Sequence, residues 1–466
     1  MADKWDARAK ATMGNAREAM GDAQTDAERA TVHRGQVRMA YQLADQFAGK
    51  LMHVHGLGWF RWDGKRWAED RTGEATKAVL DVLRGALADS LDDKDLRVDV
   101  RKCESAAGIS GVLNIAAKLE AFAAVVDGLD ADPYLLNCQN GTLDLRTLEL
   151  RPADPADKVT KVTGAAYQPD ARGGAWEAFL QRVLPNEAVR GFAQRYVGMA
   201  LCGRILEHKL AIFNGIGRNG KGVFYGGVND ALGEYASAAE PDLFMHREGA
   251  HPTGEMDLLG LRFVVVSESD RGRRLAEATV KRLTGGDQIR ARRMRQDFVA
   301  FTPSHTAALV TNHLPKVSGD DHALWERLRV IPFEVVIPPE EQDTHLPERL
   351  ELETAAILTW LVDGWEQYRQ IGLADPLEVR AATESYHQAS DAITRFLDEC
   401  CLVGPHLRVK VSDLCERWTR WLLDDGGEPT SKRALGEELN KRGYAEFKGT
   451  AGSRFRKGLD LQGEEA

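Results

Sequence analysis

The 466-residue chain has no long hydrophobic stretch: no run of about 18 apolar residues occurs, and its start, MADKWDARAK, lacks the apolar segment of an export signal. It also lacks any C-x-x-C pair among its six cysteines, so neither a zinc site nor a disulfide framework is expected. Internal repeats and low-complexity tracts are absent as well. These absences predict a cytoplasmic protein without membrane contact.

The charge balance is acidic, with 61 Lys and Arg against 71 Asp and Glu, a net charge of −10. Such a balance argues against a protein that coats nucleic acid with its whole surface, but it leaves room for a local basic track. With 43% hydrophobic and 28% charged residues, the composition is that of a globular protein. The length predicts about three domains.

The first 200 residues show helical and hairpin patterns in turn. Apolar residues recur at helical spacing over 36–51, and WFRWDGKRW then alternates aromatic and polar residues around an Asp-Gly turn, which predicts two short strands. Helical pattern follows over 74–127. An Asn-Gly pair in YLLNCQNGTLDLRTLEL predicts a hairpin, and 175–203 is again helical.

The pattern changes at Leu210 to short apolar strands separated by helices. The strands are LAIFN (210–214), LRFVVVS (261–267), TAALVTN (306–312) and LRVIPF (328–333). Strands alternating with helices predict an α/β core with a largely parallel sheet over about 205–340. Beyond it lie an amphipathic helix, ELETAAILTWLVDGWEQYR, a linker, ADPLEV, and a small helical region.

The segment AIFNGIGRNGKGVF has the spacing of a phosphate-binding loop. Glycines let backbone N–H groups curl around a phosphate, and a lysine supplies a cation at its outer oxygens. The spacing G-x-x-x-x-G-K is complete, but a glycine stands where Ser or Thr usually holds Mg²⁺. A glycine-rich strand–helix turn has the same spacing. The residues assigned to ATP phosphates are Gly215, Gly217, Asn219, Gly220, Lys221 and Gly222.

Polar residues follow the next strands, where a nucleotide hydrolase needs them. The strand LRFVVVS ends at Ser267, Glu268 follows it and Asp270 comes two residues later, so both acids are candidates to hold Mg²⁺ through water. Asn312 lies at the tip of the strand TAALVTN, where an amide can orient the attacking water; turn chemistry is the alternative. Arg327 and Arg329 in HALWERLRVIPF are candidates for an arginine that reaches a neighbouring subunit's phosphate, or for surface ion pairs.

A basic segment, VKRLTGGDQIRARRMRQDFVAF, carries a local net charge of +4 in an otherwise acidic chain. Its alternation predicts a β-hairpin with Met294 to Gln296 near the tip. Hairpins of this kind can grip phosphates without reading sequence. A solvated charged hairpin is the alternative. The DNA contacts predicted in this segment are Lys281, Arg290, Arg292, Arg293 and Arg295.

In this order, the motifs resemble a superfamily 3 helicase of the phage and plasmid primase-helicase family, related to the poxvirus NTPase-primase. GIGRNGKG resembles its Walker A motif, VVVSESD its Walker B, KRLTGGDQIRARR its B′ motif, LVTNHLP its motif C and WERLRVIPF its arginine-finger segment. The upstream strings WFRWDGKRWAED, LLNCQNGTLDLRTLEL and AWEAFLQRVLP resemble the domain that precedes the ATPase. The resemblance covers about residues 50–385.

The resemblance implies an AAA+-like P-loop ATPase that assembles as a homo-hexameric ring, uses ATP and Mg²⁺, and translocates on single-stranded DNA. It implies that Lys221 binds phosphate, Glu268 serves metal and water, Asn312 is a sensor and Arg327 or Arg329 is the finger. Two residues depart from the family pattern: Gly222 replaces the usual Ser or Thr, and Ser267 replaces a first acid. These departures put the rate of hydrolysis and the metal dependence in doubt. Residues 1–200 offer isolated strings such as RVDVR and TLDLR but no convincing D-x-D on a strand with a downstream histidine, so no primase activity is expected.

The segment 407–458 is basic, with twelve Lys and Arg against eight acids. Two helical patterns followed by YAEFKGTAGSRFRKGLDL resemble a winged helix-turn-helix, with 431–442 as recognition helix and Lys432 and Arg433 as contacts to duplex DNA. Small helical domains also mediate protein contacts, and both readings stay open.

The predicted fold is therefore α/β, with an AAA+-like core, a mixed α+β N-terminal region and a winged-helix-like end. The predicted domains are a flexible arm (1–30), an α+β N-terminal domain (31–174), a helical collar (175–204), the ATPase (205–385) and a DNA-binding domain (390–466). We expect a replicative DNA helicase of a phage or mobile element in the bacterial host cytoplasm, with host or phage replication proteins as further candidate partners. The alternatives are an origin-binding initiator ATPase without processive unwinding and an ATP-binding DNA scaffold with little turnover.

Overall fold

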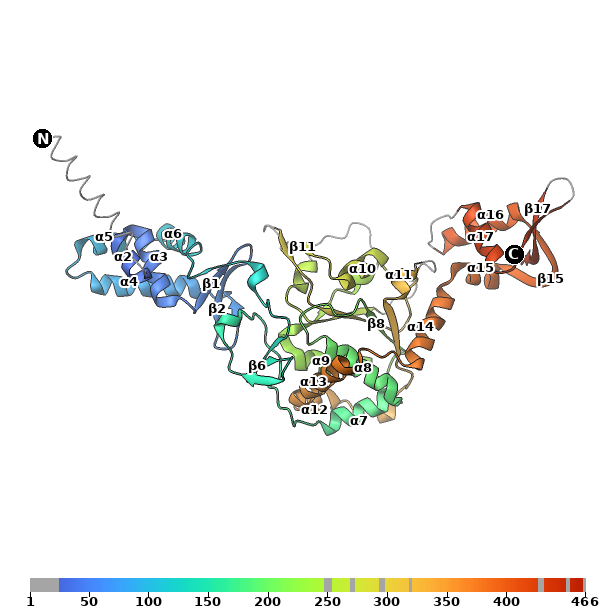
Figure 1. Ribbon diagram of the computed structural model, residues 1–466, viewed down its shortest axis with the longest axis horizontal. Helices are drawn as coiled ribbons and strands as arrows, with labels where there is room; N and C mark the ends of the chain where they lie inside the picture. The colour runs from blue at the N-terminus through green and yellow to red at the C-terminus, as the bar shows by residue number, and fades with distance from the viewer. Residues whose placement is uncertain are drawn as a thin grey trace, which may run out of the picture.

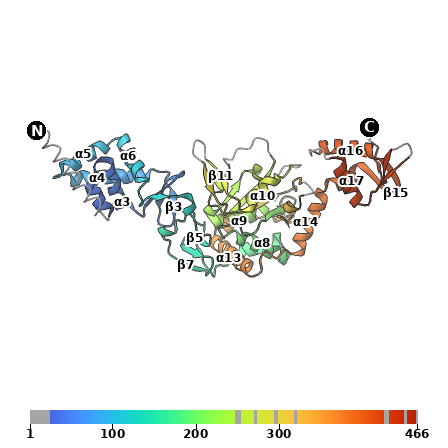
Figure 2. The same ribbon diagram turned by 45° about the horizontal axis from the view of Figure 1, so that its top comes forward.

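The structure is a computed structural model that describes residues 25–246, 254–268, 273–292, 298–317, 321–425, 431–449 and 453–463. The chain is mixed α/β and extends along one axis. Figure 1 shows the N-terminal helices at one end, a central sheet with helices on both faces, and the C-terminal elements at the other end. The turned view in Figure 2 keeps the same order of the three parts.

The N-terminal part is a helical group beside a four-stranded sheet. The described helices are α2 (Asp26–Val32), α3 (Gly35–Phe47), α4 (Glu74–Asp89), α5 (Lys94–Cys103) and α6 (Ala106–Ala116). The sheet has the order β3-β2-β1-β4, from β1 (Leu51–Val54), β2 (Gly58–Trp62), β3 (Trp67–Glu69) and β4 (Ala123–Ala124). The two strands predicted in WFRWDGKRW are confirmed as the antiparallel pair β2 and β3. The predicted flexible arm covers residues 1–30. Residues 1–24 of it lie outside the described residues, and α2 begins at Asp26, inside the predicted arm.

A second small sheet connects this part to the core. It consists of β5 (Leu135–Cys138), β6 (Gly141–Asp144) and β7 (Glu149–Arg151), preceded by η1 (Val126–Gly128) and followed by η2 (Pro155–Asp157). β5 and β6 are antiparallel, with Cys138 opposite Gly141, so the predicted Asn-Gly hairpin is confirmed. Arg262, 3% exposed, donates to the carbonyls of Leu201 and Leu135 and thereby ties this sheet to the core.

The central sheet has five parallel strands in the order β14-β8-β13-β10-β9. The strands are β8 (Leu210–Asn214), β9 (Ala236–Ala239), β10 (Phe263–Glu268), β13 (Thr306–Thr311) and β14 (Leu328–Pro332). Alternate residues face opposite sides: Phe213 belongs to one buried cluster and Ile212 to the other. Burial on both faces explains the near-continuous apolar runs that predicted these strands.

Helices cover both faces of this sheet. One face is covered by α7 (Gly174–Val183), α8 (Glu187–Met199), α9 (Lys221–Leu232) and α13 (Thr354–Ile371). The other is covered by α10 (Glu277–Gly285), α11 (His322–Trp325) and the hairpin of β11 (Ile289–Ala291) and β12 (Val299–Phe301). The remaining elements of the core are η3 (Gly233–Tyr235), η4 (Pro241–Phe244), η5 (Gly254–Leu258), η6 (Pro339–Glu341), α12 (Leu346–Glu351) and α14 (Leu377–Ser390).

The C-terminal part has its own core around Phe396 and Trp418. Its elements are α15 (Ala392–Cys400), β15 (Cys401–Lys410), α16 (Val411–Asp424), α17 (Lys432–Lys441), β16 (Glu446–Lys448) and β17 (Arg454–Leu461). The strands form an antiparallel sheet in the order β15-β17-β16. The two helices and the two-strand wing were expected from the sequence, whereas β15 was not.

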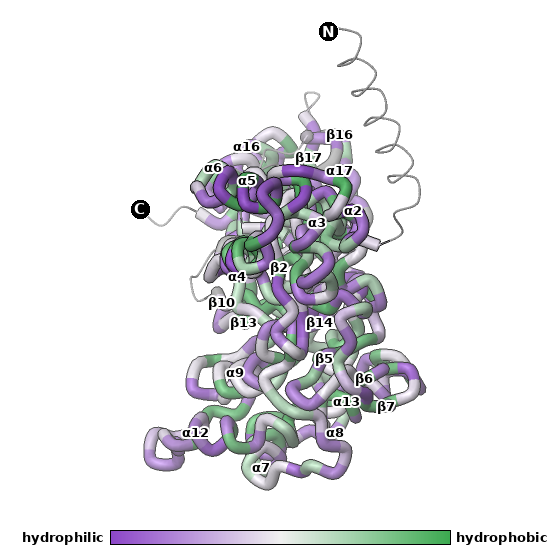
Figure 3. Tube along the Cα trace, turned by 90° about the vertical axis from the view of Figure 1, so that its left-hand side faces the viewer, coloured by the Kyte–Doolittle hydropathy of each residue, from purple (hydrophilic) through white to green (hydrophobic). Residues whose placement is uncertain are grey.

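Hydrophilic residues interrupt the hydrophobic ones all along the traced chain (Figure 3). Among the described residues, no helix is both long enough and apolar enough to cross a membrane.

Candidate functional site

The loop between β8 and α9 is shaped by its glycines. Gly220 has a φ of 81°, and a Cβ there would lie 2.5 Å from Val183 Cγ1 of α7. A Cβ on Gly215 would overlap the carbonyl oxygen of Phe333. A side chain at either position would force the loop away from α7 or β14, so glycine is required at both for the observed shape.

Lys221 is the first residue of α9 and is 5% exposed. Its Nζ donates to Gly215 O at 2.6 Å, to Asn219 Oδ1 at 3.1 Å and to Asn312 Oδ1 at 3.2 Å. These acceptors are all neutral oxygens, and burial lowers the pKa of the amine to about 8. The lysine is therefore a desolvated cation held beside a helix N-terminus, a place that favours an anion.

The parallel register brings the other predicted residues to the same edge of the sheet. Thr311 lies opposite both Asn214 on β8 and Glu268 on β10, so the strand that ends before Asn312 separates the phosphate loop from Glu268. The side chain of Glu268, and all of Asp270, lie outside the described residues. The backbone thus places the ends of β8, β10 and β13 together at the carboxyl edge, where ligands bind in open parallel sheets.

The two predicted arginines lie at the opposite edge. Leu328, between them, pairs with Leu210 at the start of β8, whereas Pro332 pairs with Asn214. Arg329 Nε is 2.5 Å from Asp375 Oδ2, and both side chains are mostly buried. Arg327 donates from Nη1 to Ala323 O at 2.6 Å, while its buried Nε has no hydrogen-bond partner among the described residues. The structure does not bring either arginine to Lys221 of the same chain.

The predicted basic hairpin is confirmed as the antiparallel pair β11 and β12. Arg290 and Arg292 are exposed, and their guanidinium carbons lie 5.0 Å and 4.7 Å from the ring centroid of Phe298, which is 45% exposed. The predicted contacts Arg293 and Arg295, with the tip at 294–296, lie outside the described residues.

Lys281, also predicted to contact DNA, pairs instead with Asp321 and lowers the pKa of that carboxyl. The charge of Lys281 is therefore partly offset within the chain. The charge of its neighbour Arg282 is offset as well, because its guanidinium makes a two-bond contact with Glu255.

At the C-terminal end, Lys432 and Arg433 open helix α17 and are both exposed. Arg433 forms an i,i+4 pair with Glu437 at 2.9 Å. A third cation of this part, Arg456, is only 1% exposed and donates to Asn440 Oδ1, Tyr444 O and Gly436 O. It therefore fastens β17 to α17 and belongs to the framework rather than to the exposed surface.

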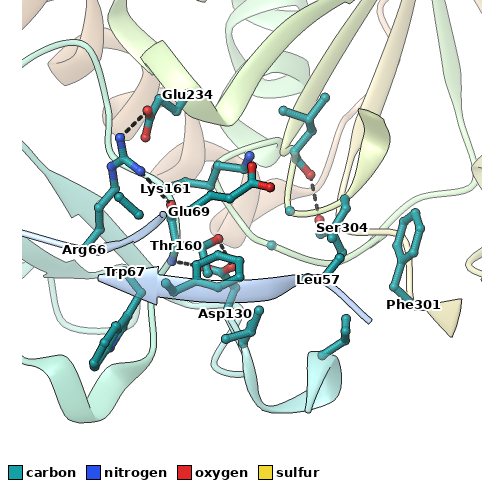
Figure 4. A pocket seen from close by; sticks show the side chains of 18 of the residues that line it. Leu57, Arg66, Trp67, Glu69, Asp130, Thr160, Lys161, Glu234, Phe301 and Ser304 are labelled. Carbon is teal, nitrogen blue, oxygen red and sulfur yellow. Dashed lines mark hydrogen bonds and ion pairs between the residues drawn. The ribbon is translucent and has the colours of Figure 1, made fainter. Parts of the chain in front are cut away.

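A cleft of about 920 Å³ lies between the N-terminal sheet and the core (Figure 4). The close-up shows the Arg66–Glu234 ion pair and Thr160 donating to Asp130 on its walls. None of the residues that line it belongs to the phosphate loop. This cleft is thus separate from the predicted nucleotide site.

Comparison with known proteins bears on both halves of the chain. Residues 40–185 match the family described as "D5 N terminal like". The "Putative helicase L207/L206" of Acanthamoeba polyphaga mimivirus is 24% identical over 63% of this chain and 33% of its own length. The "Putative primase C962R" of African swine fever virus (isolate Tick/Malawi/Lil 20-1/1983) is 23% identical over 67% of this chain and 35% of its own. The chain fits the family of phage and viral primase-helicases.

The chain spans about a third of the length of the curated relatives that it matches. The relatives named as primases partly conflict with the expectation of no primase activity. Among solved structures, the apo C-terminal region of NrS-1 aligns with a TM-score of 0.48 at 10% identity, over 92% of this chain and 100% of that chain. A likeness at that level carries no argument here.

The sequence reading missed residues whose roles depend on contacts distant in the chain. Phe298 is a single aromatic residue after the basic run, and only the fold places both arginines over its ring. Asp375, in the stretch read as a linker, is the partner of Arg329. Alternation around Phe298 was a usable signal, whereas nothing local indicated Asp375.

Proposed function

We propose that this chain is an ATP-driven DNA helicase core that hydrolyses ATP at the loop 215–222. The observation that carries the proposal is the convergence of a buried lysine, an asparagine and the end of β10 at one edge of a parallel sheet. A buried, desolvated amine is costly unless an anion compensates it. Phosphate oxygens would replace the neutral oxygens that now surround Lys221.

The residues fit a bound nucleotide with its magnesium ion. The N-terminus of α9 and Lys221 would hold the phosphates, and Glu268, with Asp270, would hold Mg²⁺ through water. The metal supplies charge neutralisation at the transferred phosphoryl group. Asn312, already fixed against Lys221, would orient the attacking water. Position 222 supplies no hydroxyl, so the metal depends on the carboxylates and phosphates.

Arg327 is our candidate for the finger that acts on a neighbouring subunit. It lies at the edge of the sheet opposite the phosphate loop, and its buried Nε has no partner in the part of the chain that the structure describes, whereas Arg329 is held by Asp375. An arginine in trans neutralises charge on the transferred phosphoryl group and ties hydrolysis to subunit motion. The proposal therefore includes a homo-oligomeric ring, with six subunits as the family resemblance implies.

Single-stranded DNA would contact the β11–β12 hairpin. Arg290 and Arg292 supply cations for phosphates, and Phe298 between them offers a face on which a base can stack. Duplex DNA would bind the winged-helix-like C-terminal part through α17, where Lys432 and Arg433 are exposed.

Primase activity is not included: Asp99 of RVDVR is buried on helix α5 beside Arg38, and Asp144 of TLDLR is bonded by Arg146.

DNA-stimulated ATP hydrolysis and strand displacement by the wild type and Lys221→Ala test the proposal. We expect hydrolysis to fall at least about a hundredfold in the variant, because the lysine acts on the transferred phosphoryl group. Equal rates for the two proteins would refute the ATPase. Hydrolysis without strand displacement would favour the origin-binding initiator instead, and nucleotide binding without turnover would favour the scaffold.

Mixing inactive variants tests the finger. Arg327→Ala subunits retain a complete phosphate loop and Lys221→Ala subunits retain the arginine, so a finger acting in trans predicts that the mixture regains hydrolysis. Arg329→Ala is the matched control: with Arg327 in place it should hydrolyse ATP by itself, so mixing it with Lys221→Ala should add no activity. An inactive Arg329→Ala that regains hydrolysis with Lys221→Ala, while Arg327→Ala does not, would reverse the assignment.

A further inference from the structure

The segment from Asn312 to Val317 follows β13 and links the candidate site to distant parts of the chain. At its start, Asn312 Oδ1 accepts from Lys221 Nζ at 3.2 Å. Four residues later stands Lys316, at most about 14 Å away along an extended chain. A displacement of Lys316 is therefore transmitted to Asn312 through very little intervening backbone.

The backbone of this segment is held from two sides. Lys316 N donates to Arg273 O at 2.7 Å, and Leu275 N donates to Lys316 O at 2.9 Å. On the other side, the buried hydroxyl of Tyr386 on α14 donates to Pro315 O at 2.5 Å. Burial raises the pKa of the Tyr386 hydroxyl, so it remains protonated and able to donate.

The side chain of Lys316 reaches the C-terminal part. Its Nζ lies 2.6 Å from Asp425 Oδ1 and 3.0 Å from Asp425 O, and Arg395 makes two further bonds to the same carboxylate. Asp425 caps the C-terminal end of α16, where the helix dipole disfavours an anion. Burial alone would raise the pKa of this carboxyl, but the bonds from Arg395 and Lys316 outweigh it and lower the pKa.

We propose that Lys316 and Tyr386 are positioning residues for Asn312, and that the Lys316–Asp425 ion pair makes the geometry of the nucleotide site depend on docking of the C-terminal part. This rests on the proposed ATPase. Arg395 and Asp425 move with the C-terminal part, and Tyr386 lies on the helix that leads into it. When the C-terminal part undocks, the segment 312–317 loses its side-chain anchor, and the contact between Asn312 and Lys221 loosens.

The chain offers a matched control for the ion pair. The Arg151–Asp157 pair in the N-terminal part spans 2.7 Å, and its side chains are 41% and 15% exposed. The Lys316–Asp425 pair spans 2.6 Å with side chains 38% and 18% exposed. Lys316→Met and Arg151→Met therefore remove cations of similar burial, but only the first lies on the path to Asn312.

Steady-state ATP hydrolysis separates positioning from a structural role. In Lys316→Met and Asp425→Asn we expect kcat to fall at least about fivefold, the lower range of couplings between sites, with KM for ATP changed less than about twofold. Arg151→Met should leave both unchanged. Equal losses in Lys316→Met and Arg151→Met would overturn the proposal.

Amide hydrogen exchange in nucleotide-free protein distinguishes this proposal from the ATPase itself. Exchange at residues 312–317 should accelerate at least about fivefold in Lys316→Met and in Tyr386→Phe, because each loses an anchor of the segment, and stay unchanged in Arg151→Met. Unchanged exchange in Lys316→Met and in Tyr386→Phe would reject the positioning role of these two residues even if ATP is hydrolysed. Faster exchange in Lys316→Met and Tyr386→Phe, together with a wild type that hydrolyses ATP no faster than Lys221→Ala, would keep the positioning role and reject the ATPase.

Discussion

Lys221 and Lys432 are both the first residue of a helix, and they differ in nearly everything else. Lys221 at the start of α9 is 5% exposed and bound to three oxygens, whereas Lys432 at the start of α17 is exposed. The first is prepared for one small anion in one geometry. The second contributes to a field that any phosphate backbone can enter. Burial thus separates a site that depends on shape from one that depends on charge alone.

The strongest test of this contrast is Arg456, a buried cation within the C-terminal part. Arg456→Met should lower the free energy of unfolding of that part by about 3 kcal/mol, because three acceptors lose a charged donor in a buried place. Arg454→Met, at an exposed neighbour paired with Glu446, should cost less than about 1 kcal/mol. Chemical denaturation of the two variants measures both. Equal costs would show that burial does not distinguish the cations here.

The exposed cations should instead control salt-dependent binding. The double variant Lys432→Ala with Arg433→Ala should weaken duplex DNA binding roughly tenfold and reduce the slope of log affinity against log salt by about 2. Removing two exposed cations of α4, with Lys77→Ala and Arg84→Ala, should change neither. Fluorescence anisotropy across a salt series is the measurement. If both double variants lose affinity alike, the binding surface is not α17.

The buried lysine should respond to pH rather than to salt. Its pKa of about 8 means that the free amine is charged below pH 8 and neutral above it. Because a bound phosphate favours the charged form, ATP binding takes up a proton, and affinity should fall roughly tenfold between pH 7 and pH 9. Lys221→Arg stays charged throughout and should show a flat profile. A pH series of nucleotide titrations tests this, and a steep fall in Lys221→Arg would assign the titration to another group.

Position 222 provides the smallest expected effect. A Cβ there meets nothing within 4 Å, so Gly222→Ser can enter without displacing a neighbour. If the missing hydroxyl limits metal binding, this variant should need severalfold less Mg²⁺ for half-maximal hydrolysis. Gly222→Ala adds the Cβ without the hydroxyl. A magnesium titration in which Ala and Ser behave alike would rule out a role for the hydroxyl.

The sequence predicted those elements that a local pattern of neighbouring residues marks. The strands β8, β10, β13 and β14 are short apolar runs, and the glycine spacing with Lys221 marked the loop between β8 and α9. β15 was missed because its residues are mostly exposed and include Gly404 and Pro405, so it has no clear alternation. Periodicity reports burial, and an exposed strand gives little signal.

Contacts between distant residues could not be predicted in the same way. Asp425 is 109 residues from Lys316, and Asp375 is 46 residues from Arg329. Each partner alone resembles an ordinary charged surface residue. Only the packing of α14 and the C-terminal part against the core selects one acid for each cation.

The strand β8 also sets a distance. Its five residues span about 17 Å, and they separate the phosphate loop at one edge of the sheet from Arg327 at the other. With the finger acting in trans, each chain carries two unlike halves of one site on opposite sides. Unlike surfaces favour a head-to-tail, heterologous contact over a two-fold one, and such a contact closes into a ring or extends as a helical filament according to the rotation between neighbours. The length of β8 would then set how far apart neighbouring sites lie along the assembly.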